Sequence, residues 1–277
     1  IPTDTLELNR KIEQTRALIQ QEKLDSAKTL LKDLLKPDTI IQVSHQWTQV
    51  YDMLAGIYRS QSMLDAAINY TEKAWYSGRN TDRLRYGKVY LPDLAYLYWE
   101  KGNFSQALKY AHNARRFFKV NPDSSRQMSL HNIFGLIYRD LGSYPRSEEH
   151  FKEAIAMAER NGKKGFKGVV LSNLGSLYMR MNEHNRAIDY YEQGRKIELE
   201  FENYQAAGRS LSVLGELYLE TDKLQAADTS LQKALHYNKK ANDLIGMCRT
   251  RNGLGKLHLM KGNYSQANHY YSLAEEM

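Results

Sequence analysis

A pattern of 40 residues recurs along the whole chain of 277 residues, and this period limits the possible folds more than any other feature. When the sequence is aligned at this period, small residues fill one column. The small column reads Thr15, Ala55, Ala95, Gly135, Gly175, Gly215 and Gly255. Repetition at a fixed period of this length is typical of stacked structural repeats. We therefore expect one elongated repeat domain rather than two globular domains.

Tyrosine fills a second column, three residues after the small column. This column reads Leu18, Tyr58, Tyr98, Tyr138, Tyr178, Tyr218 and His258. The chain has 20 tyrosines among 277 residues, so chance would place fewer than one tyrosine in this column instead of five. We interpret the tyrosines as packing residues. We interpret His258 as a packing residue in the same position, not as a metal ligand.

Each repeat shows helical spacing of apolar residues on both sides of a break, which predicts a helical hairpin. In the fourth repeat the break is the segment 142–145. We expect Gly142 to end the first helix, Ser143 to cap the second and Pro145 to occupy its first position. In the third repeat, Pro92 falls within the first helix and should either start or kink it.

The glycines of the small column predict close contact between helices. A glycine inside a helix costs roughly 1 kcal/mol relative to alanine, so four of them at one register cost about 4 kcal/mol. That cost is tolerable only if packing requires the missing side chain. We predict that the small column lets the second helix of each hairpin touch the first.

At these residues the sequence resembles the tetratricopeptide repeat family, whose unit carries Leu-Gly and then Tyr in its first helix and alanines around an apolar residue in its second. The matching residues are Leu174, Gly175, Tyr178, Ala187 and Tyr191, and again Leu214, Gly215, Tyr218, Ala227, Leu231 and Ala234. The family's usual period is about 34 residues. The longer period resembles the branch found in peptide-sensing bacterial regulators and in polarity adaptors.

The resemblance implies an all-α fold, a right-handed α-α superhelix (a tetratricopeptide solenoid) of about seven helical hairpins. We expect a single array over residues 1–277, with repeats at about 8–47, 48–87, 88–127, 128–167, 168–207, 208–247 and 248–277. The chain begins at Ile1 rather than Met, and Met277 comes before the last helix should end. We therefore expect the array to be a fragment of a longer protein.

Composition and charge narrow the class of protein. Hydrophobic residues make up 42% and charged residues 26%, which excludes a strongly disordered chain. No apolar run is long enough for a transmembrane helix and no signal peptide is visible, so we expect a soluble segment without membrane contact. Cytoplasmic and periplasmic locations both stay open. The formal charge of +7 is spread over short clusters, such as residues 79–88, and does not indicate nucleic-acid binding.

No motif in the sequence indicates catalysis. The phosphate-binding loop, the His-Glu-x-x-His zinc motif and the Gly-x-Ser-x-Gly nucleophile motif are all absent. The histidines do not pair at metal-ligand spacing, and the chain has one cysteine, Cys248. We expect no enzyme activity, no cofactor and no metal.

We place the candidate site on the first helices, which in stacked hairpins line a concave groove. Helical geometry directs residues three before, one after, and four or five after the small column away from the hairpin core. Arg209 and Arg249, which lie six residues before the small column, are added to this set. The predicted groove residues are Tyr96, Trp99, Asn132, Arg139, Ser172, Arg180, Arg209, Glu216, Arg249, Asn252 and Lys256. The alternative for any one of them is ordinary solvated helix surface.

This set of side chains predicts a peptide or protein segment as the partner. Asparagine pairs with an extended peptide backbone and arginine grips a carboxylate, so the partner should carry an acidic group and an apolar anchor. The resemblance implies the ligand-sensing or interaction region of a bacterial signalling or transcriptional regulator. The alternative is a passive cytoplasmic scaffold or assembly adaptor. An enzyme similar to the peptide-regulated phosphatases is least favoured. Those proteins keep their acting residues in a separate N-terminal bundle, whereas here the repeat register begins almost immediately.

Overall fold

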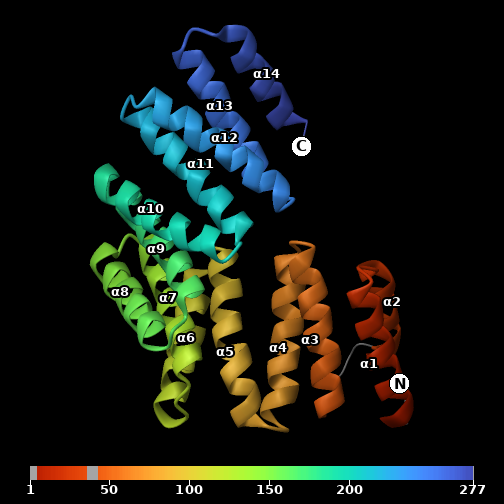
Figure 1. Ribbon diagram of the computed structural model, residues 1–277. Coiled ribbons are helices and arrows are strands. Elements are labelled where there is room, and N and C mark those ends of the chain that lie inside the picture. Colours follow the sequence, from red (N-terminus) through yellow and green to blue (C-terminus); the bar gives the residue numbers. More distant parts are fainter. Residues whose placement is uncertain (1–4, 36–42, 277) are drawn as a thin grey trace. The chain divides into compact units, whose positions relative to one another are not determined.

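The computed structural model describes residues 5–35 and 43–276, which fold into helices joined by short turns, without a strand (Figure 1). The helices are α1 (Thr5–Gln20), α2 (Leu24–Leu34), α3 (His45–Ser60), α4 (Leu64–Arg79), α5 (Arg83–Glu100), α6 (Phe104–Val120), α7 (Ser124–Asp140), α8 (Tyr144–Arg160), α9 (Lys164–Arg180), α10 (His184–Glu200), α11 (Tyr204–Glu220), α12 (Leu224–Lys240), α13 (Leu244–Met260) and α14 (Tyr264–Glu275). The predicted all-α fold of helical hairpins is confirmed. Ile1 and Met277, on which the prediction of a longer protein rests, lie outside the described residues.

The chain forms two compact units, Ile1–Ile137 and Tyr138–Met277. We call them the N-terminal unit and the C-terminal unit, and α7 spans the boundary between them. Within each unit, the two helices of a hairpin pack against each other, and second helices such as α4, α10 and α12 pack against the first helix of the next hairpin. That the hairpins act as one array stays a prediction.

The turns within the hairpins follow the predicted pattern with two differences. Gly142 has a φ of +73°, a left-handed conformation that suits glycine. It lies in the turn directly after the end of α7, as predicted. Ser143 precedes α8 as predicted, but its side chain accepts no capping hydrogen bond. Pro145 is the second residue of α8 rather than the first, a position where its missing N–H is equally harmless because the first turn of a helix has unpaired N–H groups.

Pro92 lies inside α5 and does not start it. The helix begins upstream because the Asp82 side chain accepts a hydrogen bond from the backbone N–H of Arg85 at 3.0 Å. The helix continues across Pro92 to Glu100. The alternative that Pro92 starts the helix is therefore wrong.

The small column holds the two helices of a hairpin in contact, as predicted. A Cβ atom built on Gly175 would lie 2.9 Å from the ring of Tyr191, and one on Gly215 would lie 2.5 Å from Leu231 Cγ. Both contacted side chains come from the second helix of the same hairpin. Glycine is therefore required here by close approach and not by backbone conformation.

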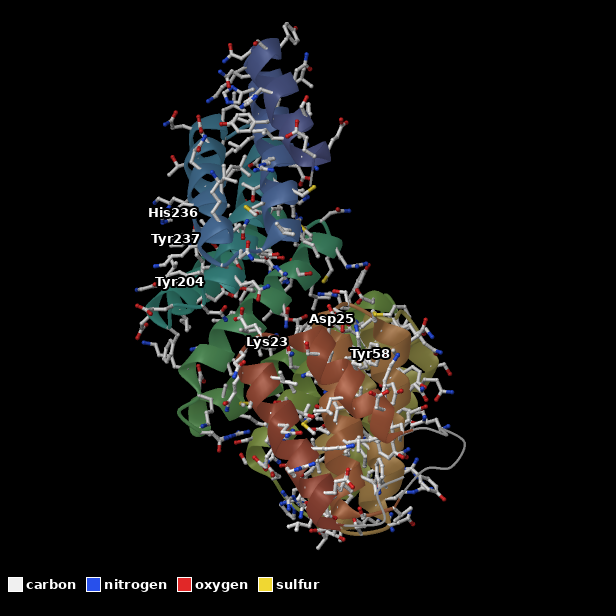
Figure 2. All side chains as sticks on the ribbon, turned by 90° about the vertical axis from the view of Figure 1, so that its right-hand side faces the viewer. Lys23, Asp25, Tyr58, Tyr204, His236 and Tyr237 are labelled. Carbon is white, nitrogen blue, oxygen red and sulfur yellow. The ribbon has the colours of Figure 1, made fainter. Side chains whose placement is uncertain are left out.

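The tyrosine column joins the two helices of a hairpin by ring stacking. Stacked ring centroids lie 5.5 Å apart for Tyr58 with Tyr70, 5.5 Å for Tyr98 with Tyr110, 5.2 Å for Tyr178 with Tyr190, and 5.4 Å for His258 with Tyr270. His258 is thus a packing residue, as predicted. Outside this column, Tyr204 stacks on Tyr237 at 5.7 Å, and both are labelled in Figure 2. These stacks occupy the space beside the close glycine contacts.

Candidate functional site

The predicted groove residues are divided between the two units. Tyr96, Trp99 and Asn132 lie in the N-terminal unit and the other eight in the C-terminal unit. The Tyr96 and Trp99 rings, near the end of α5, have centroids 5.3 Å apart, and Tyr96 is 37% exposed. The predicted aromatic pair is therefore present on the surface of the N-terminal unit.

In the C-terminal unit, Asp140 is shared between two of the predicted arginines. Its Oδ1 lies 3.0 Å from Arg139 Nε and 3.0 Å from Arg180 Nη2. Arg139 also donates from Nη1 to Ser176 Oγ at 3.1 Å, and only 12% of its side chain is exposed. Arg180 is exposed. Arg180 is therefore the accessible arginine of this group, and Arg139 is mostly covered.

Two further predicted arginines hold carboxylates of the neighbouring first helix or of its cap. Arg209 donates to both oxygens of Asp243, at 2.6 and 3.1 Å. Arg249 donates to both oxygens of Glu216, with Nε 2.7 Å from Oε1. Burial opposes ionisation of Asp243, but hydrogen bonds from Arg209 and from the backbone N–H of Gly246 hold its pKa below the ordinary value. The face of α9, α11 and α13 thus carries paired charges.

Ser172 serves a buried polar cluster between helices instead of the open surface. Its Oγ donates to Glu198 Oε1 at 2.8 Å, and Ser210 Oγ donates to Glu198 Oε2 at 2.9 Å. Glu198 is 1% exposed. Burial raises the pKa of Glu198 although both hydroxyl groups favour the charged carboxylate.

Replacing Glu198 with glutamine will raise the unfolding temperature more at about pH 8 than at about pH 4.5. A carboxyl group with a raised pKa in the folded state stabilises the fold below its ordinary pKa of 4.5. That contribution is lost as the pH rises through the raised pKa, and glutamine does not titrate. Thermal unfolding followed by circular dichroism at both pH values measures the difference. Glu149→Gln, an exposed change on α8, is the matched control, and an equal response of both variants would contradict the prediction.

A cavity of about 530 Å³ gathers three of the predicted residues on α11 and α13. Its lining comprises Glu216, Leu244, Ile245, Cys248, Arg249 and Asn252. Leu244 is 55% exposed and Ile245 is 76% exposed, so apolar surface stands beside the Arg249–Glu216 pair. Lys256 lies one turn beyond Asn252 and is also exposed. The sequence analysis missed the three apolar lining residues because they lie in the first turns of α13, before the positions that it sampled.

The N-terminal unit has a smaller polar pocket that the sequence analysis did not name. It has a volume of about 100 Å³, and Asp52, Arg59, Tyr90 and Asp93 are among its lining residues. Burial raises the pKa of Asp52 and that of Asp93, and the Tyr90 hydroxyl group donates a hydrogen bond to Asp52. The same offsets applied to the second repeat would have found Asp52 and Arg59, since they lie three before and four after Ala55.

The described part of the chain has neither a metal-binding cluster nor a membrane-spanning helix. Residues 5–35 and 43–276 contain no cluster of three or more His, Cys, Asp and Glu side chains that could hold a metal ion. Among the helices of these residues, none combines the length and the apolar character needed to cross a bilayer.

Hairpins that repeat every 40 residues around a small column define a helical repeat protein. The family model of the tetratricopeptide repeat matches residues 125–200 and 168–240. These residues belong to the tetratricopeptide repeat family, and the hairpins before and after them have the same kind of fold. No curated protein sequence matches the chain.

Several solved structures share the fold at low sequence identity. A Rap protein complexed with Competence and Sporulation Factor is 15% identical with a TM-score of 0.74, over 99% of this chain and 87% of that one. The apo quorum sensor NprR from B. thuringiensis is 15% identical with a TM-score of 0.64, over 97% and 86%. A signal-transduction ATPase with a tetratricopeptide repeat sensor from Pyrococcus horikoshii is 20% identical with a TM-score of 0.68, over 96% and 41%. The fold is thus that of a tetratricopeptide solenoid.

Proposed function

We propose that the chain is a non-enzymatic module that binds a peptide or protein segment, and that the segment occupies the cavity on α11 and α13. The observation that carries this proposal is the exposed apolar pair Leu244 and Ile245 beside the bidentate Arg249–Glu216 pair. The apolar pair takes a bulky side chain, and the neighbouring polar groups orient the backbone.

An acidic group on the ligand fits two places near this cavity. Lys256 is exposed and forms no ion pair with any described residue, so its ammonium group is available to a carboxylate. Arg249 already holds Glu216, so a carboxylate at that position has to displace the Glu216 side chain. We place the acidic group of the ligand at Lys256 and its apolar anchor at Leu244 and Ile245, about three helical turns earlier on α13.

The regulatory role that we propose is ligand sensing within a bacterial signalling or transcriptional regulator. Its support is the fold shared with a Rap protein that was crystallised with Competence and Sporulation Factor and with the quorum sensor NprR. A passive scaffold is the second possibility. Hydrogen exchange separates the two, since a sensor should gain protection on helices that do not touch the ligand.

Peptides selected by this cavity will lose roughly tenfold or more in affinity when Ile245 is replaced by aspartate, because a charge replaces the apolar contact. The probe is a random heptapeptide phage library panned against the immobilised chain, followed by isothermal titration of the selected peptides. Phe201→Asp is the matched control, because Phe201 is an exposed apolar residue of the same unit outside the cavity. Equal affinity of both variants would remove the cavity from the proposal.

A further inference from the structure

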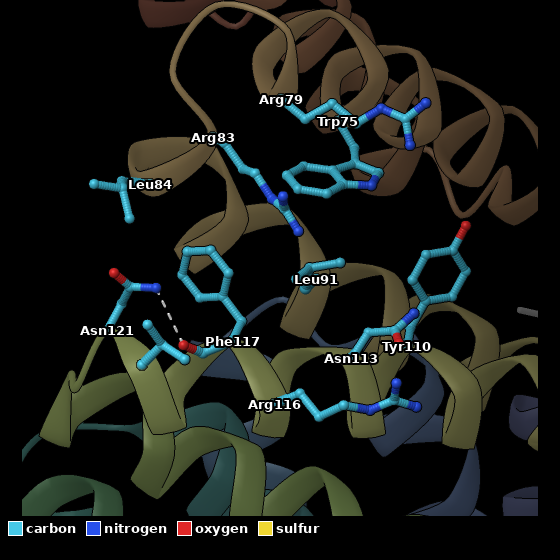
Figure 3. Close-up of a pocket in the computed structure, with 11 residues that line it drawn as sticks. Trp75, Arg79, Arg83, Leu84, Leu91, Tyr110, Asn113, Arg116, Phe117 and Asn121 are labelled. Atoms are coloured by element: carbon cyan, nitrogen blue, oxygen red, sulfur yellow. Dashed lines mark hydrogen bonds between the residues drawn. The ribbon is translucent and has the colours of Figure 1, made fainter.

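A second cavity, of about 650 Å³, lies in the N-terminal unit between α4, α5 and α6 (Figure 3). Two of these helices, α4 and α6, are the second helices of their hairpins, so the cavity does not belong to the first-helix surface considered above. Its volume is within the range of roughly 300–1,000 Å³ that is usual for ligand pockets.

The floor of this cavity is apolar and aromatic. Leu91 is 5% exposed, and Trp75 and Phe117 are partly buried. A Cβ atom built on Gly87 would lie 2.6 Å from the Phe117 ring, so the glycine lets this ring lie directly against the backbone of α5. The floor therefore offers a flat aromatic surface to a bulky apolar group.

The rim of the cavity is cationic, because the exposed side chains of Arg79, Arg83 and Arg116 lie around it. None of the three forms an ion pair with a described carboxylate, in contrast to the paired arginines of the C-terminal unit. Figure 3 shows the Arg83 guanidinium group projecting between Trp75 and Phe117. Three unpaired guanidinium groups over an aromatic floor attract carboxylates.

Two carboxylates near the rim in sequence, Glu72 and Asp82, have other partners. Asp82 accepts a hydrogen bond from the backbone N–H of Arg85 at the start of α5. Glu72 accepts hydrogen bonds from the hydroxyl groups of Tyr98 and Tyr110, at 2.8 and 2.9 Å. Neither carboxylate forms an ion pair with an arginine of the rim, so no described carboxylate neutralises the positive charge of the rim.

We propose that this cavity binds an acidic protein segment that carries a bulky apolar side chain between carboxylates. The apolar side chain lies on Trp75 and Phe117, and the carboxylates pair with the arginines. Leu84 and Val120 also line the cavity and add exposed apolar surface, since their side chains are 57% and 80% exposed. A small anion would leave these two side chains in water, whereas a protein segment covers them. The site is independent of the cavity on α11 and α13.

The test uses a fluorescein-labelled peptide, Asp-Glu-Asp-Leu-Phe-Asp-Glu-Asp, titrated with the full chain at low salt and followed by fluorescence anisotropy. We expect saturable binding that weakens roughly tenfold or more in Arg83→Glu and weakens with added salt. Lys109→Glu makes the same charge change at an exposed position of α6 outside the cavity, and we expect it to change affinity less than about twofold. Circular dichroism checks that both variants fold.

Three results would overturn the proposal. One is equal binding by Arg83→Glu and Lys109→Glu. Another is equal binding of a peptide in which Gly-Ser replaces the central Leu-Phe, because attraction would then be electrostatic alone. The third is displacement of the peptide by ADP at lower concentration than by the unlabelled peptide, which would make the cavity a nucleotide site.

Discussion

Gly175→Leu will destabilise the fold by about 1–3 kcal/mol, because the new side chain has no space between the two helices of its hairpin. Its Cβ atom alone would lie 2.9 Å from the ring of Tyr191, which is itself 5% exposed and cannot swing into solvent. The helices must separate or the ring must leave its rotamer, and both changes disturb a close-packed interior. Urea unfolding followed by circular dichroism measures the loss.

Gly56→Leu is the matched control for this prediction. Gly56 also lies in a first helix, one residue after the small column, but nothing lies within 4 Å of a Cβ atom built there. Leucine has a higher helix propensity than glycine, so the free energy of unfolding of this variant should rise by up to about 1 kcal/mol. If both variants shift stability in the same direction, helix packing is not the reason for the small column.

The fold could be predicted in detail because the features that build it depend on local spacing. The contact of Gly215 with Leu231 and the stacking of Tyr178 on Tyr190 join residues of one hairpin, so one helical period and one turn determine them. The capping hydrogen bond expected of Ser143 is absent because it depends on the torsion angles of a single turn, which composition does not specify.

The candidate site could be predicted only in outline, because its charges are set by contacts between repeats. Arg209 pairs with Asp243 and Arg249 with Glu216, over 34 and 33 residues of sequence. Both arginines were predicted to be available for a ligand, yet each already holds a carboxylate. A search for opposite charges separated by slightly less than one repeat would have indicated these pairs.

The apolar edges of the two cavities were missed for a related reason. Leu84 and Leu244 occupy the same register four repeats apart, at the start of α5 and of α13. Each is more than half exposed, at 57% and 55%. Helical periodicity assigns leucine to the core by default, and only the position of neighbouring hairpins shows that the first turn of a first helix is uncovered.

Phe151→Ala will cost about 3–5 kcal/mol, the largest stability effect that we expect from a single substitution in the C-terminal unit. Phe151 lies in α8 and is 0% exposed. Removing its ring loses the free energy gained by burying a large apolar surface, and it leaves a void. The alanines at 154 and 158 on the same helix are also 0% exposed and are too small to fill it.

Phe201→Ala removes the same ring from a position at the end of α10 where it is 52% exposed. The removal leaves no closed void there, so the free energy of unfolding should change by no more than about 0.5 kcal/mol. Urea unfolding of both variants compares identical chemistry at buried and exposed positions. Hydrogen exchange shows where the stability is lost, because each hairpin in a stack contacts only its neighbours. Phe151→Ala should therefore increase exchange first in α8 and in α9, which packs against it. Equal costs for the two variants would mean that α8 does not carry its aromatic side chain in the core of the C-terminal unit.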